Sequence, residues 1–279
     1  MRLAVLGSPI AHSKSPALQL AAYRALGLDW SYEAIEVTAE ALPAFVESRG
    51  EEWRGLSLTM PLKRDILPLL DARDDLVTLT GGANTVLFDH GGRSGVTLSG
   101  FNSDVFGIVE AFRGAGIAAV GTADVLGGGA TAASALAALA QLGARDIRVL
   151  VRDPDRSAGL TGLGNRLGVE VSIHSLLVQD RSLTVPDVIL STLPGHSEHN
   201  FEFPETVRQT SVLFDVAYDP WPSTFARAWT AAGGTVISGL EMLILQALAQ
   251  VRIFVNGDPT AELDNEAEVL SAMRAAVAG

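Results

Sequence analysis

Short apolar runs alternate with segments of helical periodicity along the first third of the chain. An alternation of this kind is typical of a mostly parallel sheet whose faces are covered by helices. The expected strands span 3–6, 30–37 and 55–59, and the expected helices span 17–26, 39–48 and 62–70. Two apolar runs at 85–89 and 95–99 flank a glycine-containing segment, which predicts a hairpin at the end of this first unit.

A second α/β unit is predicted from residue 104 onward. It begins with a helix at 104–115, and its centre is an apolar run that leads into a glycine-rich turn and an alanine-rich helix ending at 142. The further expected strands span 147–151, 188–191, 211–216 and 235–237, with a helix over 155–167. This order predicts a Rossmann-like half or more.

The composition is that of a compact soluble enzyme with room for two domains. The chain has 279 residues, of which 48% are hydrophobic, and a formal net charge of −12. Nucleic-acid binding depends on clustered lysine and arginine, and no such run occurs, so no nucleic-acid partner is expected. An anionic substrate would have to be held by local donors, because the net charge repels it at long range.

The sequence also disfavours proteins that depend on cysteine chemistry and proteins that are secreted or span a membrane. No cysteine is present, so disulfides, thiolate nucleophiles and cysteine-ligated metals are excluded, which fits a cytoplasmic location. The opening apolar run is too short for a signal peptide. The apolar stretch at 240–255 carries four polar residues and is shorter than a bilayer span, so a buried helix and no membrane partner are expected.

Residues 127–132 read Gly-Gly-Gly-Ala-Thr-Ala and fit the pattern Gly-x-Gly-x-x-Ala. Gly127 allows a tight turn, Gly129 lets backbone N–H groups approach a pyrophosphate, and Ala132 allows close helix packing. The motif predicts dinucleotide binding; the alternative is a tight strand-to-helix turn without a ligand. The cofactor-binding residues predicted here are Gly127, Gly128, Gly129 and Ala130.

Residues 7–16 read Gly-Ser-Pro-Ile-Ala-His-Ser-Lys-Ser-Pro and join an expected strand to an expected helix. A hydroxyl at such a place either caps the helix or binds a ligand. Ser13, Ser15 and a lysine in one turn exceed what a cap needs. The segment therefore predicts a binding site for a small acid that carries several hydroxyl groups.

Four further blocks follow, at 57–63, 82–86, 100–104 and 239–247. They read Ser-Leu-Thr-Met-Pro-Leu-Lys, Gly-Ala-Asn-Thr-Val, Gly-Phe-Asn-Ser-Asp and Gly-Leu-Glu-Met-Leu-Ile-Leu-Gln-Ala. Together with 7–16 and the glycine-rich turn, they resemble the shikimate dehydrogenase family over nearly the whole chain. The resemblance implies two α/β domains with a cleft between them: a discontinuous substrate-binding and catalytic domain over 1–103 plus 239–279, and a Rossmann-like NADP-binding domain over 104–238.

The resemblance also implies an activity and its residues. The family reduces 3-dehydroshikimate reversibly to shikimate, in the biosynthesis of chorismate and the aromatic amino acids. Lys63 and Asp104 match the catalytic pair, with Asp104 polarising Lys63 and binding a substrate hydroxyl; a surface lysine and a helix N-terminal carboxylate are the alternatives. The implied substrate-binding residues are Ser13, Ser15, Thr59, Asn84, Asp104, Tyr218 and Gln246; for Tyr218, packing is an equal alternative.

Met242, Gln246 and Gln250 recur every four residues and so share one helix face. A polar stripe in an apolar helix is costly unless it faces a partner, a site or water. Thr59, Asn84 and Gln246 have the alternative of being satisfied buried hydroxyls or amides without a ligand.

The cofactor preference depends on residues 151–156, Val-Arg-Asp-Pro-Asp-Arg, at the end of an expected strand. Arg152 and Arg156 match two basic positions that suit a 2′-phosphate, whereas Asp153 would repel it or accept from a free 2′-hydroxyl. NADP is expected, with NAD as the alternative. Gly239 and Met242 complete the expected cofactor-binding residues.

Two other functions stay open. A quinate or quinate/shikimate dehydrogenase using NAD is the nearest rival; Ser15 favours shikimate, because quinate-preferring relatives often carry threonine there. A non-catalytic ligand sensor is the second, and retention of Lys63 and Asp104 argues against it. No metal site is expected, since His196 and His199 lack a further ligand cluster. The subunit count, monomer or homodimer, is left open.

Overall fold

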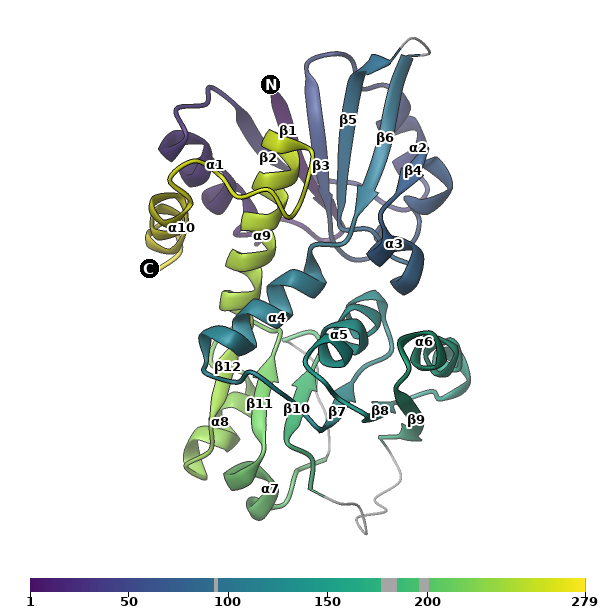
Figure 1. The fold of residues 1–279 in the computed structure, drawn as a ribbon, viewed down its shortest axis with the longest axis vertical. Helices are drawn as coiled ribbons and strands as arrows, with labels where there is room; N and C mark the ends of the chain where they lie inside the picture. Colours follow the sequence, from purple (N-terminus) through teal and green to yellow (C-terminus); the bar gives the residue numbers. More distant parts are fainter. Residues whose placement is uncertain (93–94, 177–184, 196–200, 279) are drawn as a thin grey trace. The chain divides into compact units, whose positions relative to one another are not determined.

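The computed structural model describes residues 1–92, 95–176, 185–195 and 201–278 (Figure 1). The chain divides into two compact units. Unit 1 comprises Met1–Ser103 and Leu243–Gly279, and unit 2 comprises Asp104–Met242. The sequence suggested a return to the first domain at residue 239. In the structure, the first turn of the returning helix belongs to unit 2.

Unit 1 is built on a mixed sheet with the strand order β2-β1-β3-β5-β6-β4. The strands are β1 (Arg2–Gly7), β2 (Ser31–Glu36), β3 (Trp53–Leu58), β4 (Ala72–Arg73), β5 (Thr85–Gly92) and β6 (Gly95–Phe101). β1 pairs in parallel with β2 and β3, and β4 with β6, whereas β5 is antiparallel to β3 and β6. The predicted hairpin is therefore present. The ends of β1, β3 and β6 and the start of β5 lie at one edge of the sheet.

The helices of unit 1 follow the sequence analysis in part. They are α1 (Ser15–Ala25), α2 (Leu42–Glu47), α3 (Asp75–Thr80), the continuation of α9 (Gly239–Asn256) and α10 (Glu266–Ala275). α2 is shorter than predicted and has Pro43 in its first turn, where the missing N–H is no loss.

The predicted helix over 62–70 was wrong. The segment consists of turns followed by the 3-10 helix η1 (Leu67–Leu69). Pro68 cannot donate to a helical ladder and disfavours helical geometry in the residue before it. Leu62 and Ile66 are nevertheless fully buried. Two apolar side chains four residues apart therefore pack into the core here although the segment is not an α-helix.

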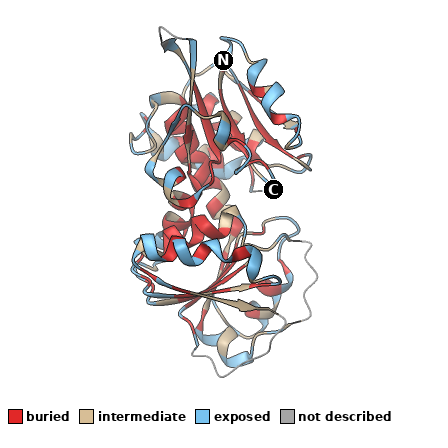
Figure 2. Ribbon diagram, turned by 90° about the vertical axis from the view of Figure 1, so that its right-hand side faces the viewer, coloured by how far each residue is buried: buried red, intermediate tan, exposed pale blue. Residues whose placement is uncertain are grey.

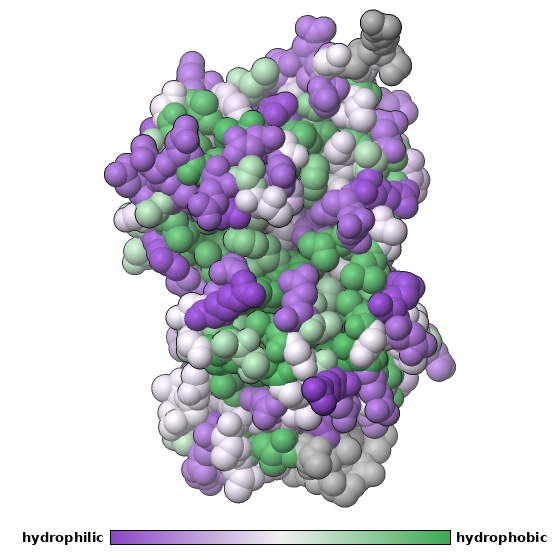
Figure 3. All heavy atoms as spheres, in the orientation of Figure 1, coloured by the Kyte–Doolittle hydropathy of each residue, from purple (hydrophilic) through white to green (hydrophobic). Residues whose placement is uncertain are grey.

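One core cluster of unit 1 lies against the sheet, and α9 packs on β3, where the Phe254 ring lies close to Gly55. Trp53, Leu56 and Phe88 are buried on β3 and β5. Figure 2 shows that buried residues run along the strands of each unit. Hydrophilic side chains are spread over both units on the face drawn in Figure 3.

Unit 2 has a parallel sheet with the strand order β12-β11-β10-β7-β8-β9. This is the doubly wound nucleotide-binding order, in which the order reverses between β7 and β10. Its strands are β7 (Thr122–Leu126), β8 (Asp146–Val151), β9 (Glu170–Ser175), β10 (Val188–Ser191), β11 (Val212–Asp215) and β12 (Val236–Ser238). Its helices are α4 (Asp104–Gly114), α5 (Ala130–Gln141), the 3-10 helix η2 (Asp155–Ser157), α6 (Gly159–Leu167), α7 (Glu205–Thr210), α8 (Thr224–Ala231) and the first turn of α9. β9 was not predicted from the sequence.

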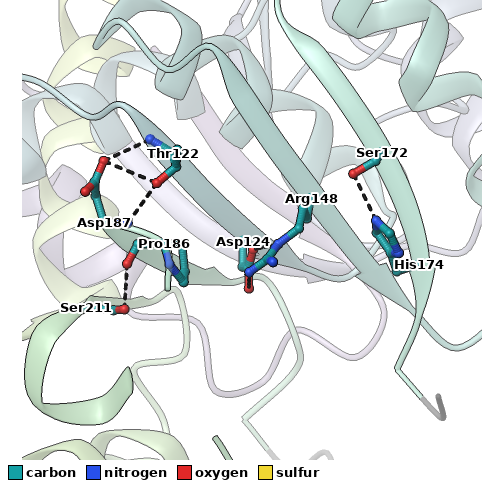
Figure 4. A network of polar contacts seen from close by, with 8 residues as sticks. All are labelled: Thr122, Asp124, Arg148, Ser172, His174, Pro186, Asp187 and Ser211. Atoms are coloured by element: carbon teal, nitrogen blue, oxygen red, sulfur yellow. Dashed lines mark hydrogen bonds and ion pairs between the residues drawn. The ribbon is translucent and has the colours of Figure 1, made fainter. Parts of the chain in front are cut away.

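A buried ion pair joins the two strands at the base of the glycine-rich turn. Asp124 on β7 lies opposite Arg148 on β8, whose Nε and Nη2 donate to the two carboxylate oxygens at 2.6 and 2.8 Å (Figure 4). Burial raises the pKa of the Asp124 carboxyl, and the hydrogen bonds from Arg148 act in the opposite direction. The bidentate geometry fixes the register of β7 against β8 just before the turn.

α9 is the one helix of the described residues that is long and apolar enough to cross a membrane. Its apolar window is 72% buried inside the protein, as expected of a core helix. The predicted buried helix over 240–255 is confirmed.

We expect Gly55→Ala to destabilise unit 1. A Cβ at Gly55 would lie 2.5 Å from the Phe254 ring of α9 and 2.6 Å from the Val86 carbonyl oxygen, and backbone cannot move aside easily. Overpacking of this kind lowers the free energy of unfolding by about 1–3 kcal/mol. Urea denaturation measures the loss.

The matched control is Gly162→Ala. Gly162 is exposed inside α6 and has open space around a Cβ, so alanine should stabilise the protein by about 0.5–1 kcal/mol. Equal effects of the two substitutions would refute the packing argument.

Candidate active site and nucleotide-binding turn

The serine turn lies between β1 and α1. The Ser13 hydroxyl accepts a hydrogen bond from the Ser15 N–H at 3.3 Å, and Pro16 lies in the first turn of α1. The N-cap residue, Lys14, makes no capping hydrogen bond with its side chain, and the Ser13 hydroxyl is the acceptor for the first backbone N–H of α1. Ser15 is buried, and its hydroxyl does not cap α1. Helix capping therefore does not explain why a serine stands at position 15.

The loops after β1 and β3 lie side by side at the same sheet edge. The Thr59 N–H donates to the Leu6 carbonyl at 2.9 Å, and the Ser8 N–H donates to the Met60 carbonyl at 3.1 Å. A Cβ at Gly7 would lie 2.5 Å from the Thr59 methyl group. Glycine at position 7 therefore allows Thr59 to approach the loop that carries the two serines.

Lys63 is half-buried in the turns that follow β3, and not inside a helix as predicted. Its carbonyl accepts a hydrogen bond from the Ala83 N–H at 2.8 Å. The lysine segment is thereby tied to the chain just before Asn84.

The Asn84 amide is the centre of a buried polar cluster at this edge. Its Oδ1 accepts from the Ser103 N–H and the Thr85 hydroxyl, both at 2.9 Å. Its Nδ2 donates to Ser103 Oγ at 2.9 Å and to Gln246 Oε1 at 3.4 Å. Asn84 and Gln246 are 2% and 7% exposed, and both predicted positions are thus in one hydrogen-bonded group.

Asp104 is the first residue of α4 and directly follows Ser103. Its side chain is buried at 4% exposure. A carboxylate in the first turn of a helix is stabilised by the helix dipole. Asp104 belongs to unit 2 and Lys63 to unit 1.

The glycine-rich turn has the backbone that a pyrophosphate site needs. Gly127 has a φ of +105°, a conformation that favours glycine. A Cβ at Gly129 would meet nothing within 4 Å, and Gly129 is the N-cap of α5 without any side chain that caps it. Ala132 is fully buried. Open space over uncapped N–H groups at a helix N-terminus fits the diphosphate of NADP.

Gly128 and Ala130 complete this turn. A Cβ at Gly128 would collide with Ser157 of η2, so glycine lets the turn pack on the segment after β8. Ala130 is the first residue of α5.

The residues expected to read the ribose lie at the end of β8. Arg152, Asp153 and Arg156 are all exposed. Asp153 accepts from the Arg156 N–H at 3.4 Å and so supports the turn into η2. This contact gives Asp153 a structural role beside the one in cofactor choice.

Three further predicted residues are Tyr218, in the loop after β11, and Gly239 and Met242, in the first turn of α9. A Cβ at Gly239 would collide with the Val216 backbone, which is a packing reason for that glycine. Met242 is buried in the first turns of α9. Burial, and to a smaller degree the charge of Asp219, raises the pKa of the Tyr218 hydroxyl.

Thr192 was not predicted from the sequence, yet it packs against the nucleotide-binding turn. Its hydroxyl donates to the Leu126 carbonyl at 2.7 Å and lies 2.5 Å from where a Gly127 Cβ would be. A polar Ser-Thr-Leu-Pro-Gly segment at the end of the buried β10 was the available signal.

A hollow in unit 2 also opens here, lined by Ser191, Leu193, Pro194, Gly195, Asp215, Ala217, Ser223, Thr224 and Phe225.

Within the described ranges, no three histidine or acidic side chains are grouped as metal ligands. His196 and His199 lie outside the described residues.

Comparison with known proteins identifies the family of this chain. The family model of the shikimate dehydrogenase substrate-binding domain matches residues 5–86. A shikimate dehydrogenase (NADP(+)) of Thermus thermophilus is 35% identical over 257 residues, which cover 91% of this chain and 92% of that protein.

Solved structures are similar over the full chain. A crystal structure of Mycobacterium tuberculosis shikimate dehydrogenase is 39% identical, with a TM-score of 0.80 over 98% of this chain and 99% of that one. A Thermus thermophilus shikimate 5-dehydrogenase in complex with NADP(H) and shikimate is 30% identical, with a TM-score of 0.80 over 99% and 100% of the two chains. The chain belongs to the shikimate dehydrogenase family.

Proposed function

We propose that this protein is an NADP-dependent oxidoreductase that reversibly reduces the 3-keto group of 3-dehydroshikimate to shikimate. The observation that carries the proposal is the buried group of Asn84, Ser103 and Gln246 at the sheet edge where the serine turn and Thr59 also lie. Hydroxyls and amides gathered at one edge suit a small ligand with several oxygens. The family membership supports the same activity.

Each residue has a role that its chemistry supports. We assign the substrate carboxylate to the hydroxyls of Ser13 and Ser15, which donate without adding charge. The ring oxygens are assigned to neutral donors and acceptors and to one carboxylate: Thr59, Asn84, Asp104, Tyr218 and Gln246.

Lys63 is assigned the proton. An ammonium group can donate to the oxygen that gains charge during reduction and can then be recharged from water. Asp104 is assigned to polarise Lys63 and to accept from a substrate hydroxyl. This assignment of the pair rests on the resemblance and on the buried, helix-terminal position of Asp104.

NADP would be held by the turn Gly127–Ala130 and, at its 2′-phosphate, by Arg152 and Arg156, with Asp153 opposing. Gly239 and Met242 are assigned to the same cofactor. When bound, NADP supplies the hydride. The backbone N–H groups at the start of α5 orient the diphosphate, and the guanidinium groups favour a phosphorylated ribose.

We further propose that the enzyme acts in the cytoplasm, as a monomer or homodimer. Its partner is then a small molecule, without nucleic acid or membrane.

A matrix of initial rates for shikimate and quinate against NADP and NAD tests the proposed function. We expect the highest kcat/KM for shikimate with NADP, with a modest preference for NADP because Asp153 opposes the two arginines. Asp153→Thr should strengthen that preference and Arg152→Ala should reverse it. A parent enzyme that favours NAD by about tenfold or more would support the NAD-dependent quinate rival. No turnover with any pair would support the ligand sensor.

Lys63→Ala should lower kcat by roughly 10²- to 10⁴-fold, because general acid–base catalysis is lost, while the dissociation constant of shikimate changes only several-fold. Arg64→Ala removes a neighbouring exposed charge and is the control, with kcat close to that of the parent. A Lys63→Ala variant that lost binding and kept its kcat would make Lys63 an anchor instead.

Ser15→Ala should raise the KM for shikimate far more than the KM for NADP. The lost hydrogen bond to a charged group corresponds to about 1–3 kcal/mol of binding free energy. Steady-state kinetics with each substrate varied in turn measures this. Unchanged KM together with a lower melting temperature would show that Ser15 serves only the fold.

A further inference from the structure

Asp215 is a buried acid in unit 2 that the proposed function leaves without a role. It is 2% exposed and ends β11, directly after the fully buried Leu213 and Phe214. Its Oδ1 accepts a hydrogen bond from the Ala217 N–H at 3.2 Å, and its Oδ2 accepts one from the Ser223 hydroxyl at 2.5 Å. A carboxylate at this depth is costly unless donors surround it. Two of its donors come from the segment that follows β11.

The Ser223 hydroxyl has two tasks at once. Its oxygen accepts from the Ala226 N–H at 3.0 Å and so caps α8. A hydroxyl has one proton, and a carboxylate can only accept, so that proton is donated to Asp215. Ser223 therefore joins the start of α8 to the end of β11.

This contact closes the loop 216–222, which lies between two other segments of unit 2. A Cβ at Gly239 would collide with the Val216 carbonyl, so the loop begins against the start of α9. A Cβ at Gly195 would lie 2.8 Å from the Asp219 carbonyl oxygen, so the loop also approaches the segment after β10. The hollow in unit 2 opens at the same strand ends, and apolar packing alone does not fix the loop there.

The proposed cofactor would extend to this loop. A doubly wound sheet binds a dinucleotide across the point where the strand order reverses, here between β7 and β10. Arg152 and Arg156, assigned to the 2′-phosphate, follow β8 on one side of that point. The nicotinamide half then falls on the side of β10 and β11. Gly239, which packs on Val216, is already assigned to the same cofactor.

We propose that Asp215 and Ser223 are positioning residues, which hold the loop 216–222 against Gly239 and so preorganise the part of the site that receives the nicotinamide. The inference rests on the proposed function, in which a dinucleotide is bound by unit 2. Asp215 and Ser223 act through the loop and not by touching the cofactor. Without their hydrogen bond, the loop must be ordered when the cofactor binds, and this lowers the affinity.

The test compares two ligands by calorimetry. NADP carries the nicotinamide, and 2′-phospho-ADP-ribose carries every other part of NADP. For Ser223→Ala, we expect the dissociation constant of NADP to rise by about three- to twentyfold. The dissociation constant of 2′-phospho-ADP-ribose should stay within about twofold of the parent value. A helix cap that serves stability alone would not change the ratio of the two constants.

Two further variants separate the tasks of Ser223. Ser223→Asp can still cap α8 but cannot donate to Asp215 as a carboxylate. It should raise the dissociation constant of NADP at least as much as Ser223→Ala does. Ser223→Thr keeps a hydroxyl that can cap and donate, and it should bind both ligands as the parent does.

Trp229→Phe is the matched control in the same helix. It removes a buried hydrogen bond of α8, which the Trp229 indole N–H donates to the Ser211 carbonyl at 2.9 Å. It should lower the melting temperature and leave the ratio of the two dissociation constants unchanged.

Three results would overturn the inference alone. They are unchanged NADP binding in Ser223→Ala, parent-like NADP binding in Ser223→Asp, and a rise in the ratio for Trp229→Phe equal to that for Ser223→Ala. A parent that binds NAD and not NADP would overturn the assigned cofactor, and NAD with ADP-ribose would then serve as the test pair. A parent that binds neither dinucleotide would overturn the proposed function and this inference together.

Discussion

Buried amides must find hydrogen-bond partners, and this requirement organises the centre of unit 1. α9 is largely apolar, yet it carries Gln246 and Gln250 on the face that packs into the core. An unpaired amide at such depth costs stability, so α1, β3 and β5 each provide a partner. The same groups that satisfy the helix also hold Asn84 and Ser103 at the sheet edge. Stability and the geometry of the proposed site are therefore supplied by one set of contacts.

In unit 2 the proposed site is held in place by glycines that let backbone segments pack closely, whereas in unit 1 it is held by hydrogen bonds of buried amides. Gly127 and Gly128 let the turn after β7 lie against Thr192 and Ser157. The Asp124–Arg148 pair fixes the strands beneath it. A turn held on several sides presents its N–H groups in one arrangement before any ligand binds, and this is the preorganisation that a charged ligand requires.

Periodicity and turn residues were sufficient to predict most strands of both sheets, the hairpin and the fold class. The helix expected over 62–70 failed because Leu62 and Ile66 keep helical spacing in a segment that Pro68 prevents from forming an α-helix. The strand β9 went unpredicted, and its only well-buried residue is Val171, so its sequence lacks a strong apolar signal.

The site was predicted more by resemblance than by pattern. Single residues such as Asn84 or Gln246 carry no local signal, because their partners lie 19 and 162 positions away in the chain. Asp153 and Arg156 are only three positions apart, but the hydrogen bond from the Arg156 N–H to the Asp153 carboxylate forms only because the backbone turns there. The partners of the Gln250 amide, Gln19 and the Asn84 carbonyl, lie far from it in the chain, and the sequence alone shows neither contact.

The division of α9 between the two units has a consequence for how the protein is made. A ribosome completes the first 103 residues long before it reaches Leu243, so β3 and β5 emerge without the helix that closes them. Until then Ser57, Thr85 and Gln19 lack the Gln250 amide, and Gly55 lacks the Phe254 ring. Unit 2 is one continuous segment of the sequence, from Asp104 to Met242, so all of its elements are available as soon as that segment has emerged. The unit that comes first in the chain is therefore the last to complete its core during synthesis.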